Sequence, residues 1–155
     1  MDAALAEVNQ RRMADKLREA GLRVTLPRVT VLSTLERMHG HRSADEVLAA
    51  LRESGIDLGR ASVYNILNDF VRTGLVMVAD VGPGRTMYEL TNDWHAHFVC
   101  SDCGKVFDVP AASLPDPHTL RTACGFEARE VQINFKGPCP DNGKCPENPA
   151  NSTAP

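Results

Sequence analysis

Metal-binding side chains are concentrated between His95 and Asp108. His95 and His97 are two residues apart, so on a β-strand their rings point to the same face. Cys100 and Cys103 form a CxxC pair, and Asp108 brings an oxygen ligand back on a second strand-like run. Thiolates and the nitrogen and oxygen ligands suit different ions, so the pattern predicts two separate metal sites.

A second cysteine pair, Cys139 and Cys145, lies in a turn-rich loop near the end of the sequence. Together with Cys100 and Cys103 it can close a tetrahedral four-thiolate zinc site, which is a structural arrangement. Such binding is worth about 10–16 kcal/mol in zinc-finger peptides, where it also supplies folding energy. The alternative is a free or redox-active CxxC pair. The fifth cysteine, Cys124, is interpreted as a small buried side chain.

The second site would contain His95, His97 and Asp108. Imidazole and carboxylate ligands suit Fe(II), Mn(II), Co(II) or Zn(II) in five- or six-coordinate geometry. The alternative is a pair of surface histidines on an edge strand. A zinc-dependent hydrolase with a metal-bound water is a further possibility, although no separate general base stands out.

The chain has 155 residues, and 43% of them are hydrophobic. No apolar run approaches the roughly 20 residues of a membrane helix, and the acidic N-terminus lacks a signal-peptide pattern, so we expect a cytoplasmic protein without membrane contact. The net charge of −3 is unevenly distributed between the two halves of the chain. Residues 11–76 carry eleven Lys and Arg against eight Asp and Glu, and residues 93–155 carry five against eight. A basic front half fits a module that contacts phosphates.

The front half contains four helix patterns followed by a hairpin. We expect helices over residues 9–20, 25–38, 43–54 and 59–74, with a loop over residues 40–42 and a capping box formed by Ser43 and Glu46. Strand-like runs over residues 75–81 and 86–90 flank the turn 82–85. This order predicts a winged helix, in which a helix enters the DNA major groove.

Polar side chains cover the exposed face of the helix over residues 59–74. They are of the kind that reaches base edges and phosphates. The predicted DNA-binding residues are Arg60, Ser62, Tyr64, Asn65 and Asn68 in this helix, Arg23 and Arg28 at the second helix, and Arg85 at the hairpin tip. The alternative is a winged-helix or zinc-stabilised module that binds protein rather than DNA.

The back half is predicted to be a small α/β domain. Residues 91–94 are expected to be a hinge, 110–117 a loop, 117–124 a short helix, 126–135 a strand and 147–155 a disordered tail. The fold class is therefore α+β, with a winged-helix domain over residues 1–90 and a metal-binding domain over residues 95–146.

Several motifs together resemble the ferric-uptake-regulator (Fur) family of bacterial metal-responsive repressors. The matching segments are Arg23–Arg28, His41–Glu46, Ala61–Asn65, Gly74–Val76, Met87–Leu90, His95–Lys105 and Gly137–Pro140. The resemblance covers about residues 10–146. It implies a homodimer that binds a palindromic DNA operator, with a C-terminal dimerisation domain and no enzymatic activity.

The resemblance also implies a set of ligands for the regulatory metal, Fe(II) or Mn(II) with Zn(II) possible: His41, Glu89, His95, His97 and Asp108. An ion bound by both domains would favour the arrangement in which the recognition helices of a dimer match successive major grooves. Moving the population from mostly open to mostly closed takes differential binding on the order of 5 kcal/mol.

Two branches of the family remain open. Asp108 and Asn65 are similar to peroxide-sensing members, in which bound Fe(II) reacts with peroxide and a ligand histidine, here His41 or His95, is oxidised. Glu89 is more similar to iron-uptake members. The leading hypothesis is a peroxide-sensor-like repressor, and the alternative is an iron, manganese or zinc uptake regulator.

Overall fold

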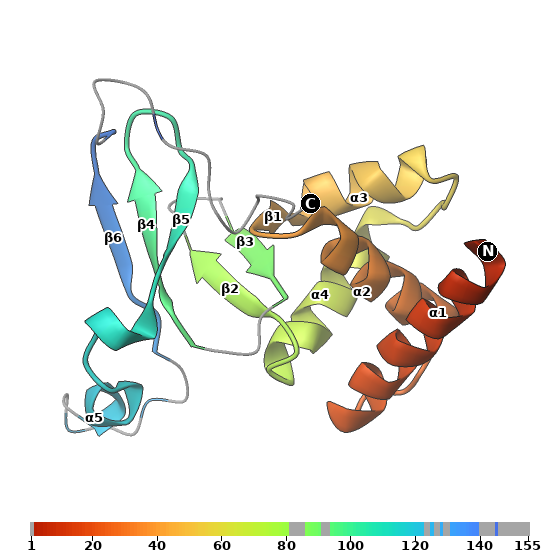
Figure 1. Cartoon of the computed structure of the whole chain (residues 1–155), viewed down its shortest axis with the longest axis horizontal. Coiled ribbons are helices and arrows are strands. Elements are labelled where there is room, and N and C mark those ends of the chain that lie inside the picture. Colours follow the sequence, from red (N-terminus) through yellow and green to blue (C-terminus); the bar gives the residue numbers. More distant parts are fainter. Residues whose placement is uncertain are drawn as a thin grey trace. The chain divides into compact units, whose positions relative to one another are not determined.

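The structure is a computed structural model that describes residues 2–80, 86–90, 94–122, 125, 128, 131–139 and 145 (Figure 1). The described residues form two units. The first contains residues up to Val78 together with residues 86–90, and the second contains Ala79, Asp80 and the residues from Trp94 onward.

Four helices form the body of the first unit: α1 (Asp2–Glu19), α2 (Leu26–Met38), α3 (Ala44–Glu53) and α4 (Arg60–Arg72). All four helices predicted from the sequence are present, but α1 begins at Asp2 rather than at residue 9. The Ala, Leu and Glu residues that precede residue 9 are strong helix formers, which accounts for the extension. The apolar faces of the helices meet in one core that includes Met13, Leu17, Leu32, Leu35, Leu51, Val63, Leu67 and Phe70.

The predicted helix boundaries at α3 and α4 are confirmed. The Ser43 hydroxyl accepts from the Glu46 N–H at 3.2 Å, and the Glu46 carboxylate accepts from the Ser43 N–H at 2.7 Å, which completes the capping box. After α4, Gly74 adopts a φ of 74°, a left-handed conformation that suits glycine and ends the helix.

A three-stranded sheet has the strand order β1-β3-β2, and it belongs to the first unit except for Ala79 and Asp80 at the end of β2. Its strands are β1 (Arg42–Ser43), β2 (Met77–Asp80) and β3 (Thr86–Glu89). The sequence predicted the hairpin strands β2 and β3 but placed Arg42 in a loop, because two residues are too short to show alternation. In β1, Arg42 pairs with Tyr88 and Ser43 with Met87. The turn that contains Arg85 lies outside the described residues. The winged-helix prediction is confirmed.

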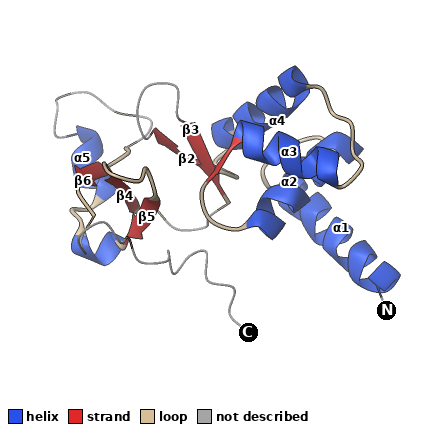
Figure 2. Ribbon diagram, turned by 90° about the horizontal axis from the view of Figure 1, so that it is seen from above, coloured by secondary structure: helices blue, strands red, loops and turns tan. Residues whose placement is uncertain are grey.

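The second unit is a sheet with the strand order β5-β4-β6 and a short helix (Figure 2). Its elements are β4 (Ala96–Cys100), β5 (Val106–Val109), the 3-10 turn η1 (Ala111–Ser113), α5 (Pro117–Thr122) and β6 (Asn134–Gly137). The neighbours of β4 differ in direction, because β5 is antiparallel and β6 is parallel to it. The α+β fold class is confirmed.

The position of the last strand corrects the sequence analysis. A strand was expected over residues 126–135, but β6 runs from Asn134 to Gly137, and none of the described residues between 126 and 133 is in a strand. Pairing with β4 sets this register, which local alternation cannot reveal. At Gly137 a Cβ atom would lie 3.0 Å from the Phe98 ring, so glycine permits the close approach of the two strands.

Other expectations are corrected in detail or fall outside the described residues. The loop predicted over residues 110–117 contains the single turn η1, and the helix predicted over residues 117–124 is present as α5 from Pro117 to Thr122. Cys124, residues 91–93 of the expected hinge and the tail 147–155 lie outside the described part of the chain. Among the described helices, none has the length and apolar character that crossing a membrane requires.

Candidate metal centres and nucleic-acid interface

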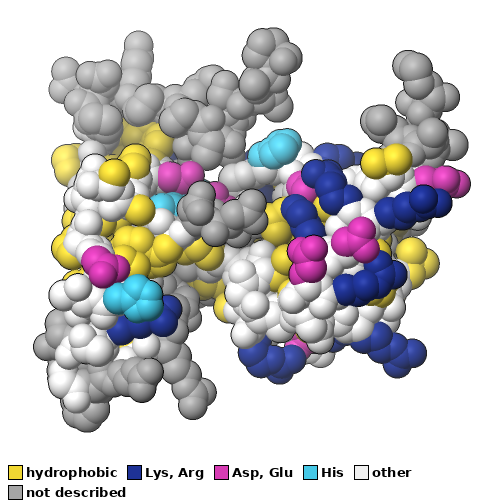
Figure 3. Space-filling view, turned by 60° about the horizontal axis from the view of Figure 1, so that its bottom comes forward, with side chains coloured by type: hydrophobic (Ala, Val, Ile, Leu, Met, Phe, Trp, Pro, Cys, Tyr) yellow, Lys and Arg dark blue, Asp and Glu magenta, His cyan; other side chains and the backbone are white. Residues whose placement is uncertain are grey.

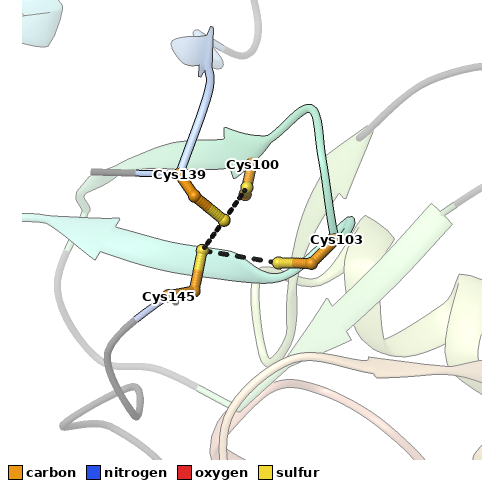
Figure 4. A group of neighbouring side chains, drawn as sticks. All are labelled: Cys100, Cys103, Cys139 and Cys145. Atoms are coloured by element: carbon orange, nitrogen blue, oxygen red, sulfur yellow. Dashed lines mark hydrogen bonds between the residues drawn. The ribbon is translucent and has the colours of Figure 1, made fainter. Parts of the chain in front are cut away.

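Four cysteine sulfurs converge in the second unit (Figure 4). Cys100 ends β4, Cys103 lies in the turn that follows, and Cys139 comes just after β6. The Sγ atoms of Cys100 and Cys139 are 3.3 Å apart, those of Cys103 and Cys145 are 3.4 Å apart, and those of Cys139 and Cys145 are 3.0 Å apart. These separations exceed the roughly 2.05 Å of a disulfide bond, so the four residues are thiols in one cluster.

Hydrogen bonds from backbone N–H groups position the cysteine cluster and favour the thiolate form of Cys100. The Cys103 N–H, directed at the Cys100 sulfur, lowers the pKa of Cys100 to about 6. The hydrogen bond between the thiols of Cys145 and Cys139 raises the pKa of Cys145. The Asp102 carboxylate accepts from the Cys139 N–H at 2.9 Å and so joins the two cysteine pairs.

The arrangement of the four thiols fits a zinc ion. One ligand atom from each cysteine lies within 4.8 Å of the others. Zn–S bonds of about 2.3 Å place the sulfurs of a tetrahedral site about 3.8 Å apart, so only small side-chain movements are needed. The predicted division between a sulfur ligand set and a nitrogen and oxygen ligand set is also present, because the cysteines form a group of their own.

The second unit also brings together the predicted ligands His95, His97 and Asp108. The two imidazole rings have centroids 4.8 Å apart and an interplanar angle of 69°. His97 is paired with Asp108 across β4 and β5, and His95 Nε2 lies 3.6 Å from Asp108 Oδ1. His97 is only 2% exposed, so this group is not a pair of surface histidines.

The first unit brings together the other two predicted ligands, His41 and Glu89. Extending the β1–β3 register by one residue places His41 opposite Glu89. His41 Nε2 lies 3.2 Å from Glu89 Oε2, and both residues are buried. The Arg42 guanidinium donates to the Met38 carbonyl at 2.8 Å, which holds the segment before β1 against the end of α2. A buried carboxylate beside an imidazole suits a divalent cation.

The predicted DNA-binding residues of α4 lie on one side of that helix. Arg60, Ser62, Asn65 and Asn68 are exposed, and Tyr64 is half-buried. The opposite side packs into the core through Val63, Ile66, Leu67 and Phe70. The exposed groups are therefore available to a partner outside the chain.

The arginines at α2 differ in their surroundings. The Arg28 guanidinium donates to the Asp69 carboxylate at 2.6 Å and to the Arg23 carbonyl at 3.0 Å. Its side chain is only 21% exposed, so it links α2 to α4 inside the unit. The Arg23 side chain is exposed, and its contact with DNA stays a prediction.

Positive side chains are distributed among carboxylates on the helical unit. On the face drawn in Figure 3, the Lys and Arg side chains of the helical unit have Asp and Glu side chains between them. Glu36, for example, binds both Arg12 at 2.6 Å and Lys16 at 3.0 Å. These two basic residues of α1 thus fasten that helix to α2.

Sequence reasoning missed four supporting residues: Arg42, Asp45, Asp69 and Asp102. Each acts through a contact with a group in a different element or loop, and no periodic pattern marks such contacts. Asp102 alone carried a signal, because it lies inside the CxxC segment.

Comparisons with known proteins agree on one family. A sequence model described as "Ferric uptake regulator family" matches residues 19–136. A ferric uptake regulation protein from Legionella pneumophila is 35% identical over 130 residues, which is 82% of this chain and 96% of that protein. A manganese-bound ferric uptake regulator structure from Pseudomonas aeruginosa matches with a TM-score of 0.67 and 35% identity, over 82% of this chain and 97% of that one.

A solved zinc uptake regulator bound to zinc and DNA is also similar. Its TM-score is 0.62 at 27% identity, and the match covers 85% of this chain and 93% of that one. The structural likeness thus extends to a regulator seen on DNA.

Proposed function

Because the chain belongs to the ferric uptake regulator family, we propose that it is a dimeric repressor that binds a palindromic operator when Fe(II) or Mn(II) joins its two units. Members of this family are metal-responsive transcription regulators rather than enzymes, so the chain is not a hydrolase.

One observation carries the proposal: each unit holds an incomplete set of nitrogen and oxygen ligands. The first unit offers His41 and Glu89, and the second offers His95, His97 and Asp108. Two or three donors cannot fill the five or six positions that Fe(II) or Mn(II) prefers, whereas all five together can. An ion shared by both units would stabilise one relative arrangement of them, and that arrangement would fit successive major grooves.

The four cysteines have a different role in the proposal. A zinc ion held by Cys100, Cys103, Cys139 and Cys145 would stabilise the second unit, which corresponds to the family's dimerisation domain. It would remain bound while the regulatory ion exchanges, because thiolates prefer zinc to Fe(II) or Mn(II).

The proposed contact with DNA is the exposed side of α4. Tyr64, Asn65 and Asn68 would reach base edges, while Arg60 and Ser62 would contact the backbone near the start of the helix. Arg23 and Arg85 would add backbone contacts. Arg28 supports this surface from behind through Asp69.

The experiment is operator binding by fluorescence anisotropy with a palindromic duplex of the family type. The regulatory ion is removed with a chelator, zinc is retained, and Fe(II), Mn(II) or Zn(II) is added back. The proposal expects tight binding with Fe(II) or Mn(II) and at least a tenfold loss without them. Equal binding in all states, or no binding in any, would contradict it.

The signal is tested by adding micromolar peroxide to the Fe(II) and Mn(II) forms. For a peroxide sensor, only the Fe(II) form loses operator binding, and mass spectrometry finds one added oxygen on His41 or His95. If both forms keep binding, the protein is an uptake regulator for the metal that activates it. Asp108 and Asn65 are similar to peroxide-sensing members and favour the loss of binding. Glu89 is more similar to iron-uptake members and favours retained binding.

A further inference from the structure

Arg60, the first residue of α4, is bound by a carboxylate of the same unit. Its Nη2 atom lies 3.1 Å from the carboxylate of Asp45, which belongs to the first turn of α3. The guanidinium also lies over the Tyr64 ring, with Cζ 5.5 Å from the ring centroid, and Nη2 is 3.5 Å from the Tyr64 hydroxyl. Three side chains from two helices therefore form one contact group at the start of α4.

The group lies on the surface rather than in the core. The side chain of Arg60 is 64% exposed and that of Asp45 is 58% exposed. The pair is not needed to satisfy a buried charge, and an exposed ion pair contributes little to stability. Asp45 has another favourable interaction, with the N-terminal end of the α3 dipole, so its charge does not depend on Arg60.

A carboxylate and a phosphate compete for the same guanidinium. Both present oxygen atoms that accept a pair of parallel N–H bonds from arginine. Arg60 adjoins Tyr64 on the side of α4 that carries Ser62, Asn65 and Asn68. A phosphate that approached this side would have to displace Asp45 from Arg60 or bind in its presence.

We propose that Asp45 is an internal competitor for the DNA phosphate that Arg60 binds, and that it weakens operator binding. The inference rests on the proposed DNA-binding function of α4. The contact would keep affinity for DNA of any sequence low, because phosphate contacts supply most non-specific binding. The opposite possibility is that Asp45 orients Arg60 for DNA, in which case its removal would weaken binding.

The test compares charge-neutralising variants in the full-length, zinc-containing, Mn(II)-loaded protein. Asp45→Asn removes the competing charge and keeps the shape of the side chain. Asp57→Asn is the matched control, because Asp57 is exposed and only three residues before Arg60. Arg60→Gln and the double variants Asp45→Asn/Arg60→Gln and Asp57→Asn/Arg60→Gln repeat the comparison without the guanidinium, and circular dichroism confirms that each variant is folded.

The proposal expects Asp45→Asn to bind both the operator and a scrambled duplex about two- to fivefold more tightly per half-site than Asp57→Asn does. When Arg60→Gln is also present, the Asp45→Asn and Asp57→Asn variants should bind the duplexes with equal affinity. Equal affinities of the two single variants, a weaker Asp45→Asn variant, or an advantage that persists without Arg60 would each overturn the proposal. If the wild-type protein bound no duplex with Mn(II), the proposed function would fail first and this inference with it.

Discussion

His41 Nε2 lies 3.2 Å from Glu89 Oε2 in the winged-helix unit, and both residues are buried. They come from segments almost fifty residues apart in the sequence, and the two-residue strand β1 brings them together by pairing with β3. In the proposed regulatory site, the Glu89 carboxylate and the His41 imidazole are the ligands that the winged-helix unit would contribute.

The first prediction concerns Glu89. Glu89→Gln keeps the size of the side chain but removes the negative charge that would bind the ion. We expect the apparent Mn(II) affinity, measured from operator binding during a Mn(II) titration, to fall by more than about tenfold, since even residues that only support metal ligands cost 10- to 100-fold. Glu53→Gln, at an exposed position of α3, is the control and should titrate like the wild type.

The second prediction concerns the cysteine cluster. Cys103→Ser removes one of four thiolates, and a three-thiolate site no longer matches the preference of structural zinc. We expect the protein to retain less than one zinc ion per chain after gel filtration and to lose the sheet signal of the second unit in circular dichroism. Cys124→Ser should keep its zinc. Full zinc retention by Cys103→Ser would show that the cluster is not a four-thiolate site.

The third prediction concerns Asp102, which accepts from the Cys139 N–H. Asp102→Ala leaves this N–H without its carboxylate, so the Cys139 side of the zinc site should be less well held. We expect zinc transfer to a chromogenic chelator to become about 10- to 100-fold more favourable. Asp102→Asn keeps an acceptor oxygen and should show a smaller effect. If Asp102→Ala transferred zinc to the chelator as the wild type does, Asp102 would not support the zinc site.

The fourth prediction separates Arg28 from Arg23. Arg28→Gln breaks the ion pair with Asp69, whose other cationic partner among the described residues is Arg72 at 2.6 Å. The pair is mostly shielded from water, so we expect a loss of about 1 kcal/mol and a lower Tm. Arg23→Gln should leave the Tm unchanged, because Arg28 binds the backbone carbonyl of Arg23 rather than its side chain. Equal effects on Tm would contradict this assignment.

The helices and the cysteine site were accessible from sequence because local rules determine them. The capping box at Ser43, the apolar stripe of α4 and the CxxC pair each act over a few residues. The winged-helix and α/β units were predicted from the order of the expected helices and strands along the chain.

What the sequence did not reveal depends on pairing between distant segments. Strand β1 is too short to show a period, and β6 takes its register from β4 rather than from its own alternation. The ion pair of Arg28 was not predicted, because its partner Asp69 is 41 residues away, and the DNA contact of Arg28 stays a prediction. Asp45 was not predicted to have a role either, because its contact with Arg60 joins residues 15 positions apart in two helices.

The central claim is that one ion is shared by ligands from both units, and counting bound Mn(II) tests it most directly. Electron paramagnetic resonance would measure Mn(II) per chain in the zinc-containing wild type, in His41→Ala and His97→Ala, and in the double variant, with His118→Ala as an exposed control. We predict one Mn(II) in the wild type and the control, and the loss of that same ion in each single variant and in the double variant. Two ions in the wild type, one lost with each single variant, would show two separate sites and contradict the account.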